Sequence, residues 1–152
     1  MSQPTLYVAT DEFVAQALLS DLLPVPAATT LPKLESWPVY SGTIRGFATV
    51  GIVGGGELEN ALEDPVVSVG TWAAVPGSDN PQWGAAAQLA SIVWRAAKSR
   101  FVPRTYRQSV KYESALVQSV SPVARPRRIA DPDASAAHFE TEIRLHWVPV
   151  IP

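Results

Sequence analysis

The longest amphipathic pattern in the chain spans residues 79–101 and predicts a central helix. Apolar side chains recur there at the helical spacing of three and four residues, namely Trp83, Ala86, Ala87, Ala90, Val93, Trp94, Ala97 and Phe101. Asp79 or Asn80 is suited to cap this helix, and Pro81 at its first position has no N–H to leave unpaired. Pro103 ends the pattern. We therefore expect the helix to lie across the core, with both tryptophans buried.

A shorter helix is predicted to begin at Thr10, whose hydroxyl is suited to cap it. Its apolar stripe consists of Phe13, Ala17, Leu18 and Leu22. Pro24 ends it, and residues 24–46 then form a Pro-rich connection that carries Trp37 and Tyr40. Because a loop of this length is uncommon inside a small domain, we expect it to be an interaction arm.

Four stretches have the composition or alternation of β-strands: residues 47–53, 66–72, 106–120 and 138–148. The last has the clearest period of two. Phe139, Thr141, Ile143, Leu145 and Trp147 share one face, and His138, Glu140, Glu142, Arg144 and His146 share the other. This alternation predicts a strand with one buried and one solvated face, whose large apolar residues belong to the core.

The order of these elements is α-β-β-α-β-β. It predicts an α+β fold in which an antiparallel four-stranded sheet is packed by the long central helix and the N-terminal helix, with extended loops. The length of 152 residues corresponds to a single domain, residues 1–152. Two segments are expected to project from it, the Pro-rich arm at residues 24–46 and a β-hairpin arm at residues 121–133.

Composition and charge exclude several classes of function. The net charge of −2 argues against a protein whose main task is to neutralise phosphates. The chain has no cysteine, which excludes disulfides, cysteine–zinc sites and thiol nucleophiles. No apolar run approaches the roughly 18 residues of a membrane span, so we expect no membrane partner.

Residues 50–56 read VGIVGGG, which resembles the strand and glycine turn of a dinucleotide-binding fold. That mechanism needs a helix N-terminus directly after the turn, where its N–H groups meet the pyrophosphate. Glu59 occupies the third glycine position, and Asp64 and Pro65 follow too soon for a crossover helix. The pattern favours a hairpin loop over a nucleotide site.

Both histidines lie on the predicted last strand. His138 and Glu140 match the H-x-E of zinc deaminases, but that zinc also needs cysteines. His138 and His146 are about 27 Å apart on an extended strand, too far to share one ion with Glu140 and Glu142. No serine has a G-x-S-x-G context either. We therefore predict no catalytic site, no metal and no cofactor, and a protein that is not an enzyme.

Arg125, Arg127 and Arg128 form the one basic cluster of the sequence. The segment is broken by proline and followed by Asp131 and Asp133. Two interpretations stay open, an exposed hairpin tip and a docking arm for an acidic partner, with nucleic-acid contact as the third alternative.

Several motifs occur in a characteristic order. An amphipathic helix and a Pro-rich loop precede a strand that ends in glycines, at residues 47–56. A D-P-x-V-x-V-x-x-W strand follows at residues 64–72, and then the alanine-rich helix with Gln88-Leu89-Ala90. A D-P-x-x-x-x-A-H-F-x-x-x-I-x-L strand closes the series at residues 131–145. This layout resembles that of the tail terminator (tail completion) proteins of long-tailed bacteriophages.

The resemblance implies a structural virion protein. Such a protein forms a ring, in this case a homohexamer, that caps the tail tube, ends its polymerisation and joins it to the head-completion (neck) proteins. Genomic DNA would pass through the ring without sequence-specific binding. The location implied is the tail–neck junction of the virion, after synthesis in the host cytoplasm. Two alternatives remain: a head-completion or neck connector ring protein, and a small nucleotide-binding enzyme supported only by the glycine run.

Exposed apolar and charged residues outside the predicted core are the candidates for subunit and tube contacts. They are Trp37 and Tyr40 in the Pro-rich arm, Glu57, Leu58, Glu59 and Leu62 in the glycine-rich loop, and Arg125, Arg127 and Arg128 in the basic cluster.

Overall fold

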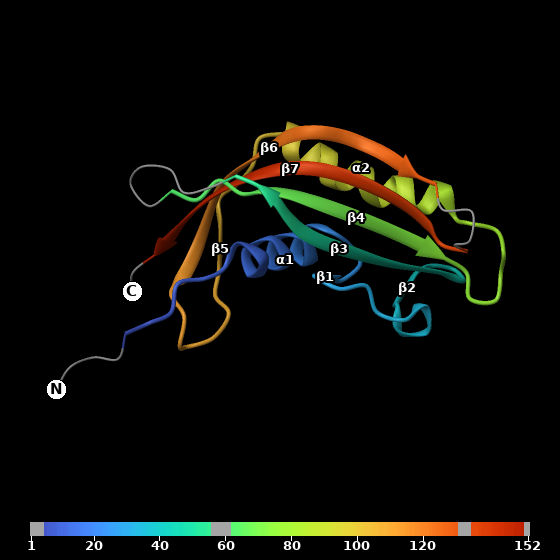
Figure 1. Cartoon of the computed structure of the whole chain (residues 1–152), viewed down its shortest axis with the longest axis horizontal. Coiled ribbons are helices and arrows are strands. Elements are labelled where there is room, and N and C mark those ends of the chain that lie inside the picture. Colours follow the sequence, from blue (N-terminus) through green and yellow to red (C-terminus); the bar gives the residue numbers. More distant parts are fainter. Residues whose placement is uncertain (1–4, 56–61, 131–134, 151–152) are drawn as a thin grey trace.

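The structure is a computed structural model that describes residues 5–55, 62–130 and 135–150 (Figure 1). Its elements are α1 (Asp11–Leu22), β1 (Ala27–Ala28), the 3-10 helix η1 (Leu34–Ser36), β2 (Val39–Ser41), β3 (Ile44–Gly54), β4 (Val66–Ala74), α2 (Trp83–Lys98), β5 (Arg104–Tyr106), β6 (Ser114–Ile129) and β7 (Ala137–Val150). More of the described residues lie in strands than in helices.

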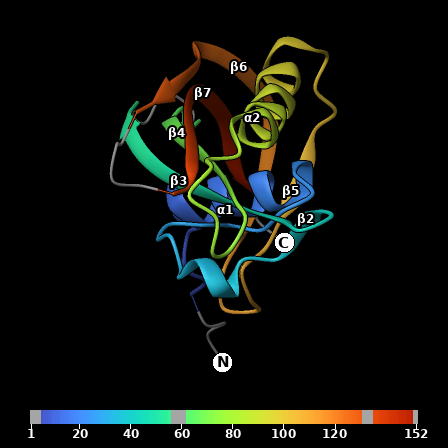
Figure 2. The ribbon, with the colours of Figure 1, turned by 90° about the vertical axis from the view of Figure 1, so that its right-hand side faces the viewer.

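All seven of these strands belong to one sheet, in the order β1-β3-β4-β7-β6-β5, with β2 also paired to β3. β1 runs parallel to β3, and every other pair is antiparallel. The sheet is strongly curled, as the end-on view shows (Figure 2).

The predicted α+β fold with a four-stranded antiparallel sheet in the order α-β-β-α-β-β is therefore wrong. The sheet is mixed, and it contains three short strands, β1, β2 and β5, that the prediction lacks. Two or three residues are too few to leave a periodic pattern, so long-range pairing alone creates these strands. The strand predicted at residues 106–120 is also wrong, because that range covers the end of β5, a turn and the start of β6.

The start of α1 is as predicted. The Oγ1 atom of Thr10 accepts a hydrogen bond of 3.2 Å from the N–H of Phe13, which satisfies one of the donors that a helix N-terminus leaves unpaired. The buried residues of α1 are Val14, Ala15, Leu18 and Leu19. The buried stripe is therefore rotated from the predicted one, and Phe13 is only half-buried at its margin.

The central helix α2 is shorter than the predicted range of residues 79–101. Gln82 is its N-cap residue and makes no side-chain capping bond, so Pro81 precedes the helix instead of opening it. Its buried residues are Ala85, Ala86, Leu89, Ala90, Val93 and Ala97. Trp83 and Trp94 are half-buried, which contradicts the prediction that both lie in the core.

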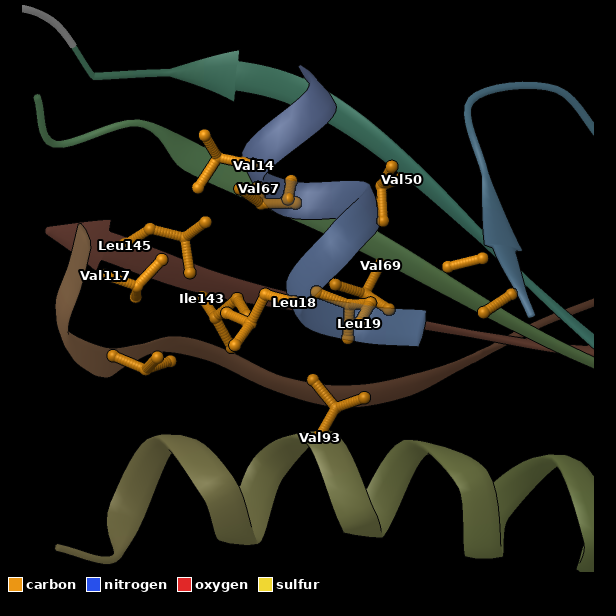
Figure 3. Packing of buried hydrophobic residues seen from close by; sticks show 14 of the residues in the cluster. Val14, Leu18, Leu19, Val50, Val67, Val69, Val93, Val117, Ile143 and Leu145 are labelled. Carbon is orange, nitrogen blue, oxygen red and sulfur yellow. The ribbon is translucent and has the colours of Figure 1, made fainter. Parts of the chain in front are cut away.

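Both helices pack against the same face of the sheet, here called the covered face. Val14, Leu18 and Leu19 of α1 and Val93 of α2 converge with Val50, Val67, Val69, Val117, Ile143 and Leu145 of the strands (Figure 3). The predicted burial of Ile143, Leu145 and Trp147 is confirmed, while Phe139 is half-buried at the end of the core. The opposite side of the sheet, the open face, carries the alternate residues of the same strands.

Candidate functional site

Polar side chains meet on the open face where β3, β4 and β7 lie side by side. The registers place Thr49 beside Gly70 and Gly70 beside Glu140, and they place Ser68 next to Glu142. These residues are far apart in the sequence, and only strand pairing brings them together. The result is a half-buried polar cluster on a sheet face that neither helix covers.

Glu140 is the centre of this cluster. One carboxylate oxygen accepts a hydrogen bond from the hydroxyl of Ser68, and the other lies 2.7 Å from Nε2 of His138. The ring of His138 stacks on the ring of Trp72, with 3.6 Å between the centroids. Nε1 of Trp72 in turn donates a 3.1 Å hydrogen bond to Oγ1 of Thr49. Hydrogen bonds and ring stacking between side chains thus connect strands β3, β4 and β7 on their open face.

Gly70 makes this convergence possible. A Cβ atom at that position would lie 2.4 Å from Oγ1 of Thr49 and 3.1 Å from Nε2 of His138. Both distances are shorter than ordinary van der Waals contact, so a larger residue would push the hydroxyl and the imidazole apart. The glycine therefore provides the space in which the side chains of three strands meet.

The electrostatics of the cluster favour an ionised Glu140. Burial of the carboxylate, the largest single influence, opposes ionisation, but the hydrogen bonds from His138 and Ser68 and the charge of Arg127 together outweigh it. The net effect lowers the pKa of Glu140 below its ordinary value of 4.5. A carboxyl group with a lower pKa in the folded protein stabilises the fold while it is ionised.

We predict that Glu140 makes stability depend on acidity. Its contribution should be fully present above about pH 4.5, the ordinary pKa of the group, and should be lost as the pH falls through the lower folded-state value. Glu140→Gln should therefore flatten the fall in unfolding free energy between neutral and acidic pH, measured by urea unfolding at several pH values. Glu142→Gln is the matched control, because Glu142 lies on the same strand face without a described hydrogen bond to its carboxylate. Parallel pH profiles for the wild type and Glu140→Gln would contradict the assignment.

The order of groups in the cluster does not suit nucleophilic catalysis. A serine nucleophile needs a hydrogen bond to a base that a third group orients. Here the hydroxyl of Ser68 bonds to Glu140, which separates it from His138. A carboxylate of lowered pKa is also a weak base. Among the described residues, no group of three or more histidine, aspartate or glutamate side chains is placed to hold a metal ion.

The Pro-rich arm folds back onto the chain. Trp37 is only 2% exposed and packs on the rings of Phe47 and Trp72, while its Nε1 donates to the carbonyl of Pro32. Tyr40 is half-buried, and its hydroxyl donates to the side chain of Gln88 in α2 at 3.2 Å. Trp37 is therefore buried within its own chain and is not the exposed aromatic anchor that the Pro-rich context predicts.

The basic cluster lies on a strand and not in a loop. Residues 121–129 continue β6 and pair antiparallel with β7, so this part of the predicted hairpin arm belongs to the main sheet. The guanidinium carbon of Arg128 lies 3.6 Å from the ring centroid of Trp83. All three arginines are exposed. Arg128 stacks on the N-terminal end of α2, Arg127 lies opposite Glu140 in the β6–β7 pair, and Arg125 has neither contact.

Of the four candidates in the glycine-rich loop, Leu62 lies within the described residues. Leu62 is half-buried, next to Glu63, which exchanges backbone hydrogen bonds with Trp147. Glu57, Leu58 and Glu59 lie outside the described residues. The interface role assigned to all nine candidate residues stays a prediction.

Both outer strands of the long sheet, β3 and β6, are paired along only part of their outer edge within the described residues. Beyond the pair that β1 forms with Thr49, no described strand lies beside the outer edge of β3. Beyond the pair that β5 forms with Val117, the same holds for β6 within the described residues. Unpaired edges present rows of backbone donors and acceptors and are templates for pairing with another chain.

The sequence interpretation missed Ser68, Gly70 and Trp72 as members of a cluster. The alternation in residues 138–148 did identify the polar face that carries His138 and Glu140. The register between β4 and β7 places Ser68 within reach of Glu140, and this register cannot be predicted from the sequence of either strand alone. A glycine within a strand of Val and Thr was the one available signal for a close approach.

Comparisons with known proteins do not extend this description, because no family model and no curated protein matches the chain. Neither described helix is both long and apolar enough to cross a membrane.

Proposed function

We propose that the chain is the subunit of a structural ring in a phage virion, a tail terminator that caps the tail tube and joins it to the neck. The proposal takes its biological setting from the order of sequence motifs. Its structural support is one observation: within the described residues, the two outer edges of the sheet differ, since β1 and β2 pair with only part of β3, and β5 pairs with only part of β6.

Two different edges favour head-to-tail association. A subunit that offers one surface to its left neighbour and another to its right neighbour forms a heterologous interface, and such interfaces close into rings when the rotation permits. The strand directions also suit a ring. From β3 through β4 and β7 to β6, each pair is antiparallel, so β6 runs opposite to β3. A rotation about an axis along the strands would place antiparallel edges side by side.

We expect the purified chain to form particles of about six subunits, measured by light scattering after size-exclusion chromatography. Mixed with tail tubes, it should appear at tube ends in electron micrographs and stop further growth. A neck connector ring would form particles of similar mass but leave tube growth unchanged. A monomer at every concentration, with and without tubes, would contradict the proposal.

A further inference from the structure

An open hollow lies where the N-terminal segment meets the connection between β5 and β6 (Figure 1). Two backbone hydrogen bonds of 2.8 Å join these segments, from the N–H of Tyr7 to the carbonyl of Lys111 and from the N–H of Glu113 to the carbonyl of Tyr7. The hollow has a volume of about 440 Å³ and is lined by Thr5, Leu6, Tyr7, Val110 and Lys111. This volume lies within the usual range of binding pockets, roughly 300–1,000 Å³.

The apolar side chains around the hollow are highly exposed. Tyr7 is 63% exposed and Val110 is 79% exposed, and Val8, which follows Tyr7 in the chain, is 53% exposed. The ring of Tyr7 packs on that of Tyr112, with 5.4 Å between the centroids. Large apolar residues that are exposed together mark sites of contact with another protein. We therefore consider the hollow a docking surface.

The charge at this surface is positive. Lys111 is exposed, and its ammonium group makes no hydrogen bond or ion pair within the described residues. A second cation lies close by, because the guanidinium group of Arg107 donates to the carbonyls of Val110 and Tyr112. Glu113 is the one acidic residue in the range 107–113. The hollow therefore fits an aliphatic side chain that has carboxylates beside it.

The chain itself contains a segment of this kind. Leu58 is the one aliphatic residue in the sequence that has a carboxylate residue on both sides, Glu57 and Glu59. These three residues lie outside the described residues. An aliphatic side chain that fills a pocket, with charged groups around it, is a common arrangement at the centre of a protein interface.

We propose that Leu58 of one copy enters the hollow of the next copy, where Glu57 and Glu59 face Lys111. Each copy then offers its hollow to one neighbour and its residues 57–59 to the other. Such a contact is heterologous, and it closes into a ring when the rotation between copies permits. This inference rests on the proposed ring and names the surfaces through which its subunits join.

Reversal of charge tests the contact. Lys111→Glu would place a carboxylate against Glu57 and Glu59, and Glu57→Lys with Glu59→Lys would place two ammonium groups against Lys111. Each variant should lower the ring population by about tenfold or more, because like charges that face each other across an interface are strongly unfavourable. Light scattering after size-exclusion chromatography measures this population, and the thermal midpoint shows that each variant is folded. Arg125→Glu is the matched control, because Arg125 is an exposed cation that does not line the hollow.

A mixture of the two reversed variants shows whether the contact joins different copies. In the mixture, the reversed segment of one variant meets the reversed hollow of the other, and the unchanged segment meets the unchanged hollow. Rings of alternating variants should therefore form, although neither variant forms them alone. A single chain with all three charges reversed should form rings as well. If either the mixture or the triple variant stays below ring size, the contact is overturned.

The apolar part of the contact has its own test. Leu58→Ala should lower the ring population by about tenfold or more, the effect of truncating a side chain that anchors an interface. Leu31→Ala is the control of the same residue type, since Leu31 is 39% exposed and does not line the hollow. Equal ring populations in these two variants would contradict the role of Leu58.

The outcomes separate this inference from the proposed function. A particle of about six chains that forms in every variant overturns the contact and leaves the ring. Loss and recovery of association as expected, but in open chains of no fixed length, support the contact and contradict the ring. A wild-type chain that stays monomeric at every concentration overturns both.

Discussion

Replacement of Trp147 by Ala should lower the free energy of unfolding by about 3–5 kcal/mol, the usual cost of deleting a large buried aromatic side chain. Trp147 is only 1% exposed and belongs to the main core. Its Nε1 also donates a 2.8 Å hydrogen bond to the carboxylate of Asp11 in the first turn of α1. The substitution would leave a cavity and remove a donor from a half-buried carboxylate. Urea unfolding followed by circular dichroism measures the loss.

Two further variants show how much of this loss of stability comes from the hydrogen bond and how much from burial. Trp147→Phe keeps most of the ring volume and loses the hydrogen bond to Asp11, so it should cost about 1 kcal/mol beyond the small change in packing. Trp94→Ala is the control of the same residue type, since Trp94 is only half-buried on the surface of α2. It should cost about 1–2 kcal/mol, because less apolar area leaves water there. A Trp94→Ala variant as unstable as Trp147→Ala would show that Trp94 is a core residue after all.

Replacement of Gly55 by Ala should cost about 3 kcal/mol, for two separate reasons. The φ angle of Gly55 is +89°, in the region that residues with a Cβ atom avoid. In addition, a Cβ atom there would lie 2.2 Å from the carbonyl oxygen of Asp64 and 2.6 Å from Cα of Pro65. Both neighbours are backbone atoms, so they cannot rotate away. Such overpacking typically costs about 1–3 kcal/mol beyond the conformational strain.

The variant Gly77→Ala measures the cost in unfolding free energy of the backbone conformation alone. Gly77 has a similar φ of +79°, but a Cβ atom there meets no heavy atom within 4 Å. Its substitution should cost only the strain of the left-handed region, about 1 kcal/mol. Thermal and urea unfolding of the two variants under the same conditions give the comparison. Equal losses would mean that the backbone beside Gly55 moves apart at no cost, in conflict with the tight packing described here.

Local patterns predicted the elements whose physics is local. Thr10 caps α1 because a hydroxyl at that position reaches the N–H three residues on. The alternation after residue 137 predicted the long strand β7, and its apolar residues Ile143, Leu145 and Trp147 are buried. In each case, the signal and the structure lie within the same few residues.

The predictions of burial were wrong for Trp37, Trp83 and Trp94, because tryptophan occurs both in the core and at its margin. Trp83 and Trp94 fit the helical stripe, but α2 turns its small residues toward the sheet and keeps both rings at the margin. Close packing of a helix on a curled sheet favours alanine at the contact, since bulky rings would hold the two apart. Trp37 shows the opposite error, because a proline-rich context suggested exposure while Phe47 and Trp72 enclose it.

By itself, the sequence determined the positions of α1, β3, β4 and β7, the polar character of the open face and the lack of any cysteine chemistry. Only the tertiary structure decided the seven-stranded mixed sheet, the meeting of Ser68, His138 and Glu140, and the partial pairing of the outer edges of β3 and β6. The physical reason is the range of the interactions. A helix cap or an alternating strand depends on neighbours in the chain, whereas register and strand order depend on contacts between segments far apart in sequence.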